Sequence, residues 1–293
     1  MNYLNPIIQS KNFKKYVVIA FFVASGFAWL GIKIYSNYYL STDNAYVNAN
    51  VVQIAPRITG QVINVFITNN QYVHQGDTLF EIDPQPFQLA VNSAKAELDL
   101  AQAELENAAI TEERVINLAK RKYLPPQEKD NSIAHFKIAL AKVEDAKANF
   151  EQIKLSLAYT KIFAPTNGLL ANVSLRTGDI VLANQPLFAL ISDQEFWVDA
   201  NFKETELEKI KVGQTATITV DMYPNHPFQG IVESISGGAG TAFSLLPPQN
   251  ATGNWVKVTQ RIPVRIRILN PNSHFPLRIA TTASVIINLH SKT

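Results

Sequence analysis

The chain has 293 residues, enough for two or three small domains. Its net charge of +2 and sequence pI of about 8.6 give no reason to expect a nucleic-acid partner. Cysteine is absent, which excludes disulfides, thiolate metal ligands, cysteine nucleophiles and a lipid-modified cysteine near the N-terminus.

The N-terminal region contains a candidate membrane span. Residues 1–15 are polar and end in three lysines, and an uncharged apolar run follows from Tyr16 to Ile32. A run of this length can just cross a hydrocarbon core of roughly 30 Å. Aromatic residues gather at its far end, as in an interfacial belt: Trp29, Tyr35, Tyr38 and Tyr39. We therefore predict a transmembrane anchor at residues 16–35.

The alternative for this segment is a cleaved secretory signal peptide. No convincing small-x-small cleavage site precedes Asp43, and the apolar run is longer than the apolar core of a usual signal peptide. We therefore favour an uncleaved anchor. The lysines before the span outnumber those after it, which predicts a cytoplasmic N-terminus (residues 1–15) and an external body.

Two segments of the chain repeat each other with an offset of 108 residues. The repeat predicts two halves of one β-domain, at residues 45–83 and 159–192. The Gly76-Asp77 pair is the exception, because the residues 108 positions later are neither glycine nor apolar. The matching pairs are Gly60/Gly168, Val65/Val173, Ile67/Leu175, Val73/Val181, Leu79/Leu187, Phe80/Phe188 and Ile82/Leu190.

These half-motifs resemble the biotinyl/lipoyl carrier domain, a flattened β-sandwich. In that family the cofactor is attached to a lysine in the tight turn between the halves. At this turn the chain instead has Asp83 and then Pro84-Gln85-Pro86-Phe87, with no lysine. A carrier subunit is therefore disfavoured, and mass spectrometry for a modified lysine would test it.

The intervening residues 84–158 are predicted to be helical. Asp83 is a candidate N-cap, and Pro84 and Pro86 suit a first helical turn. A first heptad seam consists of Phe87, Val91, Ala94, Leu98, Ala101, Leu105 and Ala108, and a second of Ile133, Phe136, Leu140, Val143, Phe150, Ile153 and Leu157. Pro125-Pro126 breaks the helix between them. We predict an antiparallel coiled-coil hairpin that projects about 45–60 Å from the β-domain.

Residues 193–293 read as a small antiparallel β-barrel. Short strands are expected at 196–202, 215–220, 230–235, 255–268 and 282–289. A long loop between the third and fourth strands, residues 236–254, is a candidate for partner or substrate contact. Its candidate contact residues are Phe243, Leu245 and Leu246, with Trp255 just beyond it.

No pattern of catalytic residues stands out. The five histidines are scattered without ligand spacing, and Gly237-Gly238-Ala239-Gly240 lacks the lysine and helix of a phosphate loop. Glu204, Glu206 and Glu208 lie beside lysines and fit a solvated face. We therefore expect no catalytic site, cofactor or metal.

The order of anchor, split lipoyl-like domain, helical hairpin and barrel resembles the HlyD-type periplasmic adaptor (membrane fusion protein) family. Four segments resemble its EmrA-like branch: Thr42-Asp-Asn-Ala-Tyr46, Phe196 to Thr205, Gly213-Gln214 with Val220-Asp221, and Phe243 to Val264. The resemblance covers residues 40–290 and implies an elongated protein of mixed α and β structure.

That resemblance implies a non-enzymatic role in multidrug efflux. Such adaptors sit in the bacterial inner membrane with a periplasmic body and link a major-facilitator drug transporter to a TolC-type outer-membrane channel. Self-association, as a trimer or hexamer, is also implied. The alternative is an adaptor of an ABC-driven type I secretion system, but those adaptors have longer hairpins and lack the Phe243–Val258 motif.

At the hairpin tip, many such adaptors present an arginine, a leucine and a serine to the channel. The candidates in this chain are Arg121, Leu124 and Ser132, with Tyr123 beside them, but their spacing departs from the family pattern. Contact between this short hairpin and a channel is therefore an open expectation.

Overall fold

The computed structural model describes residues 19–26, 38–121, 123–239, 258–271 and 274–291. The chain divides into two compact units, Met1–Asn50 with Gln194–Thr293, and Val51–Asp193. Of the predicted anchor, only residues 19–26 are described, and they are helical. Within the described ranges, no helix has both the length and the apolar character needed to cross a membrane.

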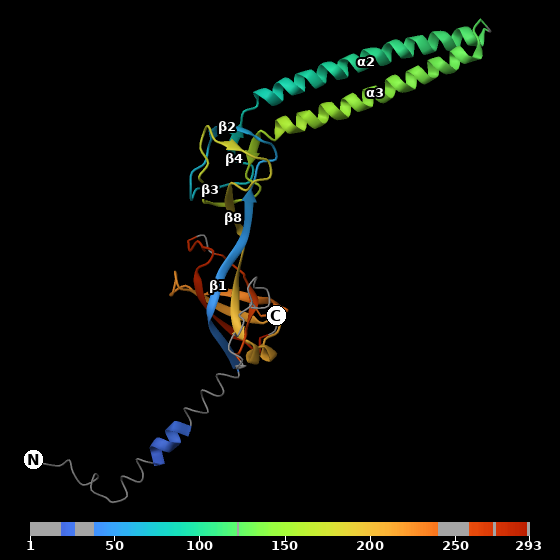
Figure 1. Cartoon of the computed structure of the whole chain (residues 1–293). Coiled ribbons are helices and arrows are strands. Elements are labelled where there is room, and N and C mark those ends of the chain that lie inside the picture. Colours follow the sequence, from blue (N-terminus) through green and yellow to red (C-terminus); the bar gives the residue numbers. More distant parts are fainter. Residues whose placement is uncertain (1–18, 27–37, 122, 240–257, 272–273, 292–293) are drawn as a thin grey trace, which may run out of the picture. The chain divides into compact units, whose positions relative to one another are not determined.

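The first unit is a closed barrel of mixed-length strands (Figure 1). Its strands follow the order β1-β12-β9-β10-β11-β8, and β8 pairs with β1 again, so the sheet has no free edge. The bounds are β1 Tyr39–Ile54, β8 Phe188–Lys203, β9 Thr215–Val220, β10 Phe228–Ile235, β11 Arg261–Ile268 and β12 Thr282–Asn288. A short 3₁₀ helix, η1 (Glu204–Lys209), follows β8.

Alternate residues of these strands fill the barrel interior. In β9 and β12, buried and more exposed residues alternate along the strand, which is the pattern of a sheet with one face turned to a core. Phe202, Ile218, Ile266 and Ile287 are almost completely buried. The barrel therefore has a packed interior rather than a channel.

The first half of β1 is a barrel strand that the sequence did not reveal. It pairs with β12 from Tyr39 opposite Asn288 to Tyr46 opposite Thr282. Ala45 and Val47 are fully buried. Alternation along a strand indicates which residues share a face, but it does not identify the neighbouring strand, so this pairing could not be predicted.

The second unit contains a small β-domain and two long helices. Its four-stranded sheet has the order β5-β4-β2-β7. Strand β6 pairs with β3 on one side and with the first part of β8 on the other. The strands are β2 Gly60–Val65, β3 Tyr72–Val73, β4 Thr78–Ile82, β5 Lys161–Phe163, β6 Gly168–Ala171 and β7 Ile180–Val181. A mixed α and β architecture is thereby established.

The two halves of the β-domain exchange equivalent hydrogen bonds. The Gly76 amide donates to the Ala164 carbonyl over 2.9 Å, and the Asn184 amide donates to the Pro56 carbonyl over 2.8 Å. Donors and acceptors in this pair are each related by the sequence offset of 108. Each half therefore completes the other, and neither half has its full hydrogen bonding alone.

The same equivalence explains a position at which the two halves have different residue types. Gly76 and Asn184 occupy equivalent positions, and both have positive φ angles, of 90° and 63°. Asparagine tolerates the left-handed region better than other residues with a Cβ atom, so it can stand where the first half has glycine.

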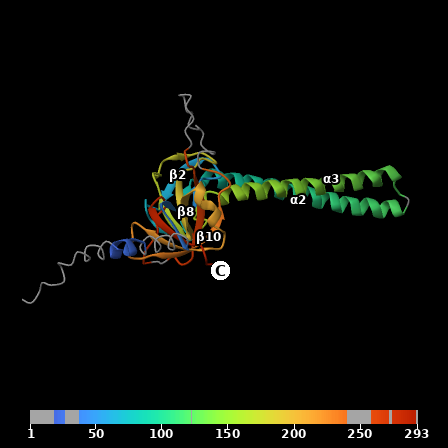
Figure 2. The ribbon, with the colours of Figure 1, turned by 90° about the horizontal axis from the view of Figure 1, so that it is seen from below.

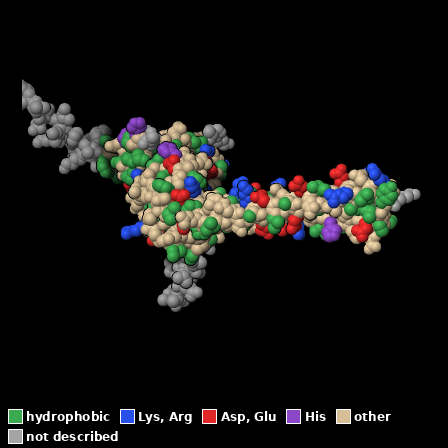
Figure 3. Space-filling model, turned by 90° about the horizontal axis from the view of Figure 1, so that it is seen from above, with side chains coloured by type: hydrophobic (Ala, Val, Ile, Leu, Met, Phe, Trp, Pro, Cys, Tyr) green, Lys and Arg blue, Asp and Glu red, His purple; other side chains and the backbone are tan. Residues whose placement is uncertain are grey.

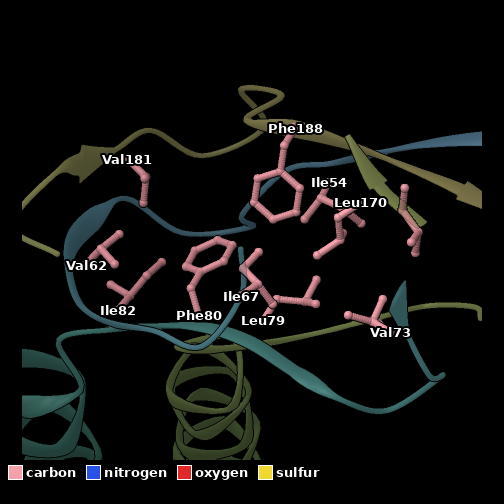
Figure 4. Close-up of a cluster of buried hydrophobic side chains, with 12 residues drawn as sticks. Ile54, Val62, Ile67, Val73, Leu79, Phe80, Ile82, Leu170, Val181 and Phe188 are labelled. Carbon is pink, nitrogen blue, oxygen red and sulfur yellow. The ribbon is translucent and has the colours of Figure 1, made fainter. Parts of the chain in front are cut away.

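Both halves contribute to one apolar core (Figure 4). Phe80 and Phe188, which are equivalent in the repeat, meet edge to face with ring centroids 6.1 Å apart. Val62, Ile82 and Leu190 are also almost fully buried. The predicted repeat positions thus form the packed centre of the domain.

Helices α2 (Gln85–Lys120) and α3 (Pro126–Ala158) lie side by side (Figures 1 and 2). At 1.5 Å per residue they are about 54 Å and 50 Å long. The Asp83 carboxylate accepts the Gln85 amide over 3.0 Å at the start of α2. The Ile82 amide donates to the Thr160 carbonyl over 2.8 Å, which brings the two ends of the insertion together at one turn of the β-domain.

The seam between the helices follows the predicted positions on α2, and on α3 it follows them except at Leu140, the other six being half-buried. All seven predicted α2 positions are buried or half-buried, with Ala94 and Ala101 the most buried. On α3, Leu140 was predicted to lie in the seam, but it is 43% exposed. The fully buried α3 residues are instead Ser132, Ala139 and Ala146. Small residues fill this seam because they let two helices approach closely.

Candidate partner-binding surfaces

The end of the helix pair is a tight turn, which we call the tip (residues 118–121 and 123–126). The amides of Arg121 and Tyr123 both donate to the Leu118 carbonyl, over 3.1 Å each. Pro126 occupies the first position of α3, where its missing amide costs no helical hydrogen bond. Backbone hydrogen bonds and a proline thus fix the turn.

The tip presents apolar and basic side chains to solvent. Tyr123 is 73% exposed, Arg121 is exposed, and Leu124 is half-buried. Figure 3 shows hydrophobic side chains gathered at this end of the helix pair. Tyrosine offers both an apolar ring and a hydroxyl, a combination that is frequent at protein interfaces. Of the four tip residues singled out from the sequence, three are therefore accessible.

Ser132 is placed differently from the expectation that it contacts a partner. Its side chain is 8% exposed, and its hydroxyl donates to the Lys129 carbonyl over 2.9 Å. This serine is part of the packing between α2 and α3, so it has little surface for a channel. The sequence could not distinguish a tip serine from a seam serine without the α3 register.

A shallow groove of about 430 Å³ lies between the helices near the tip. Its lining is largely polar and includes Glu104, Asn107, Asn131 and His135. Glu104 also forms an ion pair with Lys142 over 3.0 Å, which shows the register of the two helices. The groove is open and solvated, so we assign no ligand to it.

The apolar residues Phe243, Leu245, Leu246 and Trp255 lie outside the described residues. The strands that flank this segment are described, and Ile235 of β10 lies opposite Val264 of β11. The Ser236 amide also donates to the Pro263 carbonyl over 2.9 Å. The segment therefore leaves the barrel from the β10 end and returns at the β11 start.

Strand pairing identifies what else lies at that end of the barrel. β11 begins opposite the end of β8, with Arg261 opposite Lys203, and the η1 helix follows directly. β1 begins at the same end, because Tyr39 pairs with Asn288 at the end of β12 and Ile287 pairs with Ala216 at the start of β9. The Tyr38 and His290 rings lie there in a tilted contact, with ring centroids 4.4 Å apart. The chain therefore enters the barrel at the end from which the 240–257 segment leaves.

The titratable groups do not suggest acid–base chemistry. Tyr72 donates a 2.5 Å hydrogen bond to the Asp193 carboxylate, and this bond is the main cause of a raised Tyr72 pKa, with smaller effects of burial and of the carboxylate charge. In the part of the chain that the structure describes, no three His, Asp or Glu side chains gather as they would around a metal ion.

Comparisons with known proteins agree with this architecture. Residues 50–193 match the family model described as "RND MFP, barrel-sandwich hybrid domain", and residues 195–288 match the "AAEA-like beta-barrel domain". The crystal structure of MacA from Actinobacillus actinomycetemcomitans superposes with a TM-score of 0.65 at 20% identity, over 85% of this chain and 79% of that chain. This likeness concerns the fold alone.

Sequence relatives identify the branch. The chain is 33% identical to "Multidrug export protein EmrA" of Haemophilus influenzae, over 85% of this chain and 76% of the relative. It is 31% identical to the protein of the same name from Escherichia coli K12, over 91% of this chain and 80% of the relative. The chain therefore belongs to the HlyD-type periplasmic adaptor (membrane fusion protein) family, in its EmrA-like branch, whose members are adaptors and not enzymes.

Proposed function

We propose that this chain is the periplasmic adaptor of a tripartite multidrug efflux pump. It would link a major-facilitator drug transporter in the inner membrane to a TolC-type channel in the outer membrane. The observation that carries the proposal is the insertion of two helices of about 50 Å at a single turn of the β-domain. The names of the EmrA relatives support multidrug export as the process.

Anchoring would come from residues 16–35, with the N-terminus in the cytoplasm and the body in the periplasm. Tyr38, the first described residue before the barrel strand β1, is only three positions after Tyr35. A chain spans at most about 3.6 Å per residue, so the barrel entrance would stay within roughly 11 Å of the anchor. The transporter contact is accordingly assigned to the anchor and to the barrel end that contains Tyr38, His290 and η1.

The channel contact is assigned to the tip, through Arg121, Tyr123 and Leu124. A Tyr123→Ala/Leu124→Ala variant should reduce resistance to exported drugs while leaving the amount of adaptor in the membrane unchanged. Leu140→Ala is a matched control, because Leu140 is an exposed apolar residue on the helix pair away from the tip. Equal loss of resistance in both variants would argue against a specific role for the tip.

A paired deletion of one heptad tests whether the helices act as a spacer. The Glu104–Lys142 ion pair aligns residues 105–111 of α2 with residues 135–141 of α3. Removing both segments shortens the pair by about 10 Å and preserves the heptad register. We expect a folded, anchored protein with no drug export, measured as minimal inhibitory concentrations in cells that depend on this chain.

The control for this experiment is a compensated chain in which the two heptads are restored as copies of the next heptads along each helix. Recovery of resistance in that chain would show that length matters more than the local sequence. Unchanged resistance in the shortened chain would refute a bridging role.

A further inference from the structure

The β-domain has two open pockets at equivalent places in its two halves. The first-half pocket has a volume of about 480 Å³, and the second-half pocket has about 220 Å³. Ile67 and Val73 line the first, and the residues 108 positions later, Leu175 and Val181, line the second. The repeat therefore places two versions of one pocket in the same molecule, so their differences can be compared directly.

The loops around the two pockets are held in the same way. The Thr68 amide donates to the side-chain oxygen of Gln71 over 2.8 Å, and the Arg176 amide donates to the Asp179 carboxylate over 2.8 Å. Donors and acceptors are related by the offset of 108 in both cases. Loop geometry is thus common to both pockets, and the side chains around them are what differs.

Two exposed aromatic rings lie beside the first-half pocket and have no equivalent at the second. Phe66 lines the pocket and is 55% exposed, and its equivalent is Ser174. Phe163 is 49% exposed, lies opposite the lining residue Thr78, and has Ala55 as its equivalent. Folding alone does not require aromatic rings at exposed positions, since these side chains add little to the core.

The polar lining of the first-half pocket is also absent from the second. It contains hydrogen-bond donors, acceptors and one hydroxyl, which can act as either. The Lys161 ammonium and the Glu81 carboxylate are 3.8 Å apart, beyond direct hydrogen-bond distance, so a hydroxyl group of a ligand can bond to both. The pairs of equivalent residues are Asp77/Gln185, Thr78/Pro186, Glu81/Ala189 and Lys161/Gln53.

This combination indicates the chemistry of the ligand. A charged ligand of either sign meets a like charge in the pocket, either at Lys161 or at Asp77 and Glu81. Neutral hydroxyl groups both donate and accept, so they find a partner at each of these side chains. A sugar ring combines such hydroxyl groups with an apolar face of C–H groups that can pack on an aromatic ring. The volume is within the range of pockets that hold small ligands.

We propose that the first-half pocket binds one unit of a saccharide chain. The sugar ring packs against Phe66 and Phe163, and its hydroxyl groups bond to Glu81, Lys161 and Thr78. The inference goes beyond the proposed function and rests on it only for the periplasmic location, where the cell-wall glycan and soluble oligosaccharides are the two sources of such a chain. The binding itself does not depend on drug export.

Co-sedimentation of the purified full-length chain in detergent with cell-wall sacculi tests the proposal. Phe66→Ser gives the pocket the residue found at the equivalent position of the second half, without a change of charge. We expect the affinity for sacculi to fall about tenfold, because the sugar loses its aromatic contact.

Ile180→Ser is the matched control, because Ile180 is 74% exposed and lines the second-half pocket. This variant should sediment with sacculi as the natural chain does. Unchanged binding by Phe66→Ser, or an equal loss in both variants, would overturn the proposal.

A second pair of variants separates hydrogen bonding from general attraction by charge. Lys161→Gln introduces the residue of the equivalent position and should weaken binding about threefold, since one hydrogen bond of the sugar is altered. Lys209→Gln removes the same charge from an exposed position of the barrel and should leave binding unchanged. An equal effect of the two substitutions would mean that sacculi attract the chain by charge alone, and would overturn the proposal.

Soluble competitors identify the source of the saccharide. Release of the chain from sacculi by oligomers of N-acetylglucosamine supports the cell-wall glycan, and release by a soluble glucan alone supports a soluble periplasmic oligosaccharide. Release by the apolar cation tetraphenylphosphonium, but by neither saccharide, would overturn the assignment.

The outcomes for this inference and for the proposed function are distinguishable. A natural chain that supports drug export but binds neither sacculi nor soluble saccharides would reject the inference alone. A chain that binds saccharides, and whose deletion leaves drug resistance unchanged, would reject the adaptor role alone.

Discussion

The β-domain (residues 51–83 and 159–193) and the helix pair inserted into it are stabilised in different ways. Twelve buried apolar residues from both halves form the β-domain core, and backbone hydrogen bonds link the halves reciprocally. Only five residues of the helix pair are fully buried: Ala94, Ala101, Ser132, Ala139 and Ala146. The β-domain has its stability concentrated in a small volume, whereas the helix pair extends about 50 Å on a thin seam.

This difference has a physical cause. Residues from both repeats pack in one cluster in the β-domain core, so one deletion disturbs several neighbours at once. Along the helix pair, each seam residue contacts only the facing turn of the other helix and the turns next to it. We therefore expect damage to spread through the β-domain and to remain local in the helices.

The largest expected effect follows from Phe80→Ala. This ring is fully buried against Phe188, and its removal leaves a large cavity, for which we expect a loss of about 3–5 kcal/mol in unfolding free energy. Hydrogen exchange should rise throughout the β-domain, in β4 and β8 alike. An increase confined to β4 would contradict the idea of a shared core.

Gly168→Ala should have the next largest effect. A Cβ atom at this position would lie 2.1 Å from the Ile191 carbonyl oxygen, so a backbone segment would have to move. We expect about 3 kcal/mol of destabilisation by denaturant titration. Gly76→Ala is the matched control, because its Cβ meets nothing within 4 Å and only the positive φ opposes it, at a cost of about 1 kcal/mol.

Ala139→Leu tests the local response of the helix pair. A larger side chain in the seam would push α2 and α3 apart and cost about 1–2 kcal/mol. Exchange should rise around α3 and the facing turns of α2, while the β-domain keeps its protection. Leu140→Ala is the control and should change stability by less than about 0.5 kcal/mol, since Leu140 is 43% exposed and lies outside the seam.

The same two residues show what the sequence could and could not predict. On α3, the prediction placed Leu140 in the seam instead of the neighbouring Ala139, because leucine is the larger apolar residue. The α2 seam was predicted correctly because large and small residues alternate regularly from Phe87 to Ala108. Periodicity identifies a buried face most reliably where the steps of three and four continue without a break, and the predicted α3 positions have a break between Val143 and Phe150.

Regularity also explains which features of the β structure could be predicted from the sequence. The repeat predicted the core pair Phe80 and Phe188, because equivalent positions of a two-fold arrangement need similar side chains. The sequence contains no comparable signal for the pairing of Tyr39–Tyr46 with β12, because the two strands are more than 230 residues apart in the sequence. For the tip, the sequence identified the exposed Tyr123 and the turn, but the burial of Ser132 depends on a register that only the folded helices define.

The smallest expected effect is also the most specific test of the repeat. Asn184→Gly makes the second half match Gly76 of the first, at a position with a φ of 63°. Glycine removes the strain of the left-handed conformation but adds flexibility to the unfolded chain, so these terms should nearly cancel, within about 0.5 kcal/mol. Asn184→Ala should cost about 1 kcal/mol more, since alanine has neither the freedom of glycine nor the tolerance of asparagine. Similar stabilities for the glycine and alanine variants would mean that the backbone of this turn is not constrained as its partner turn at Gly76 is.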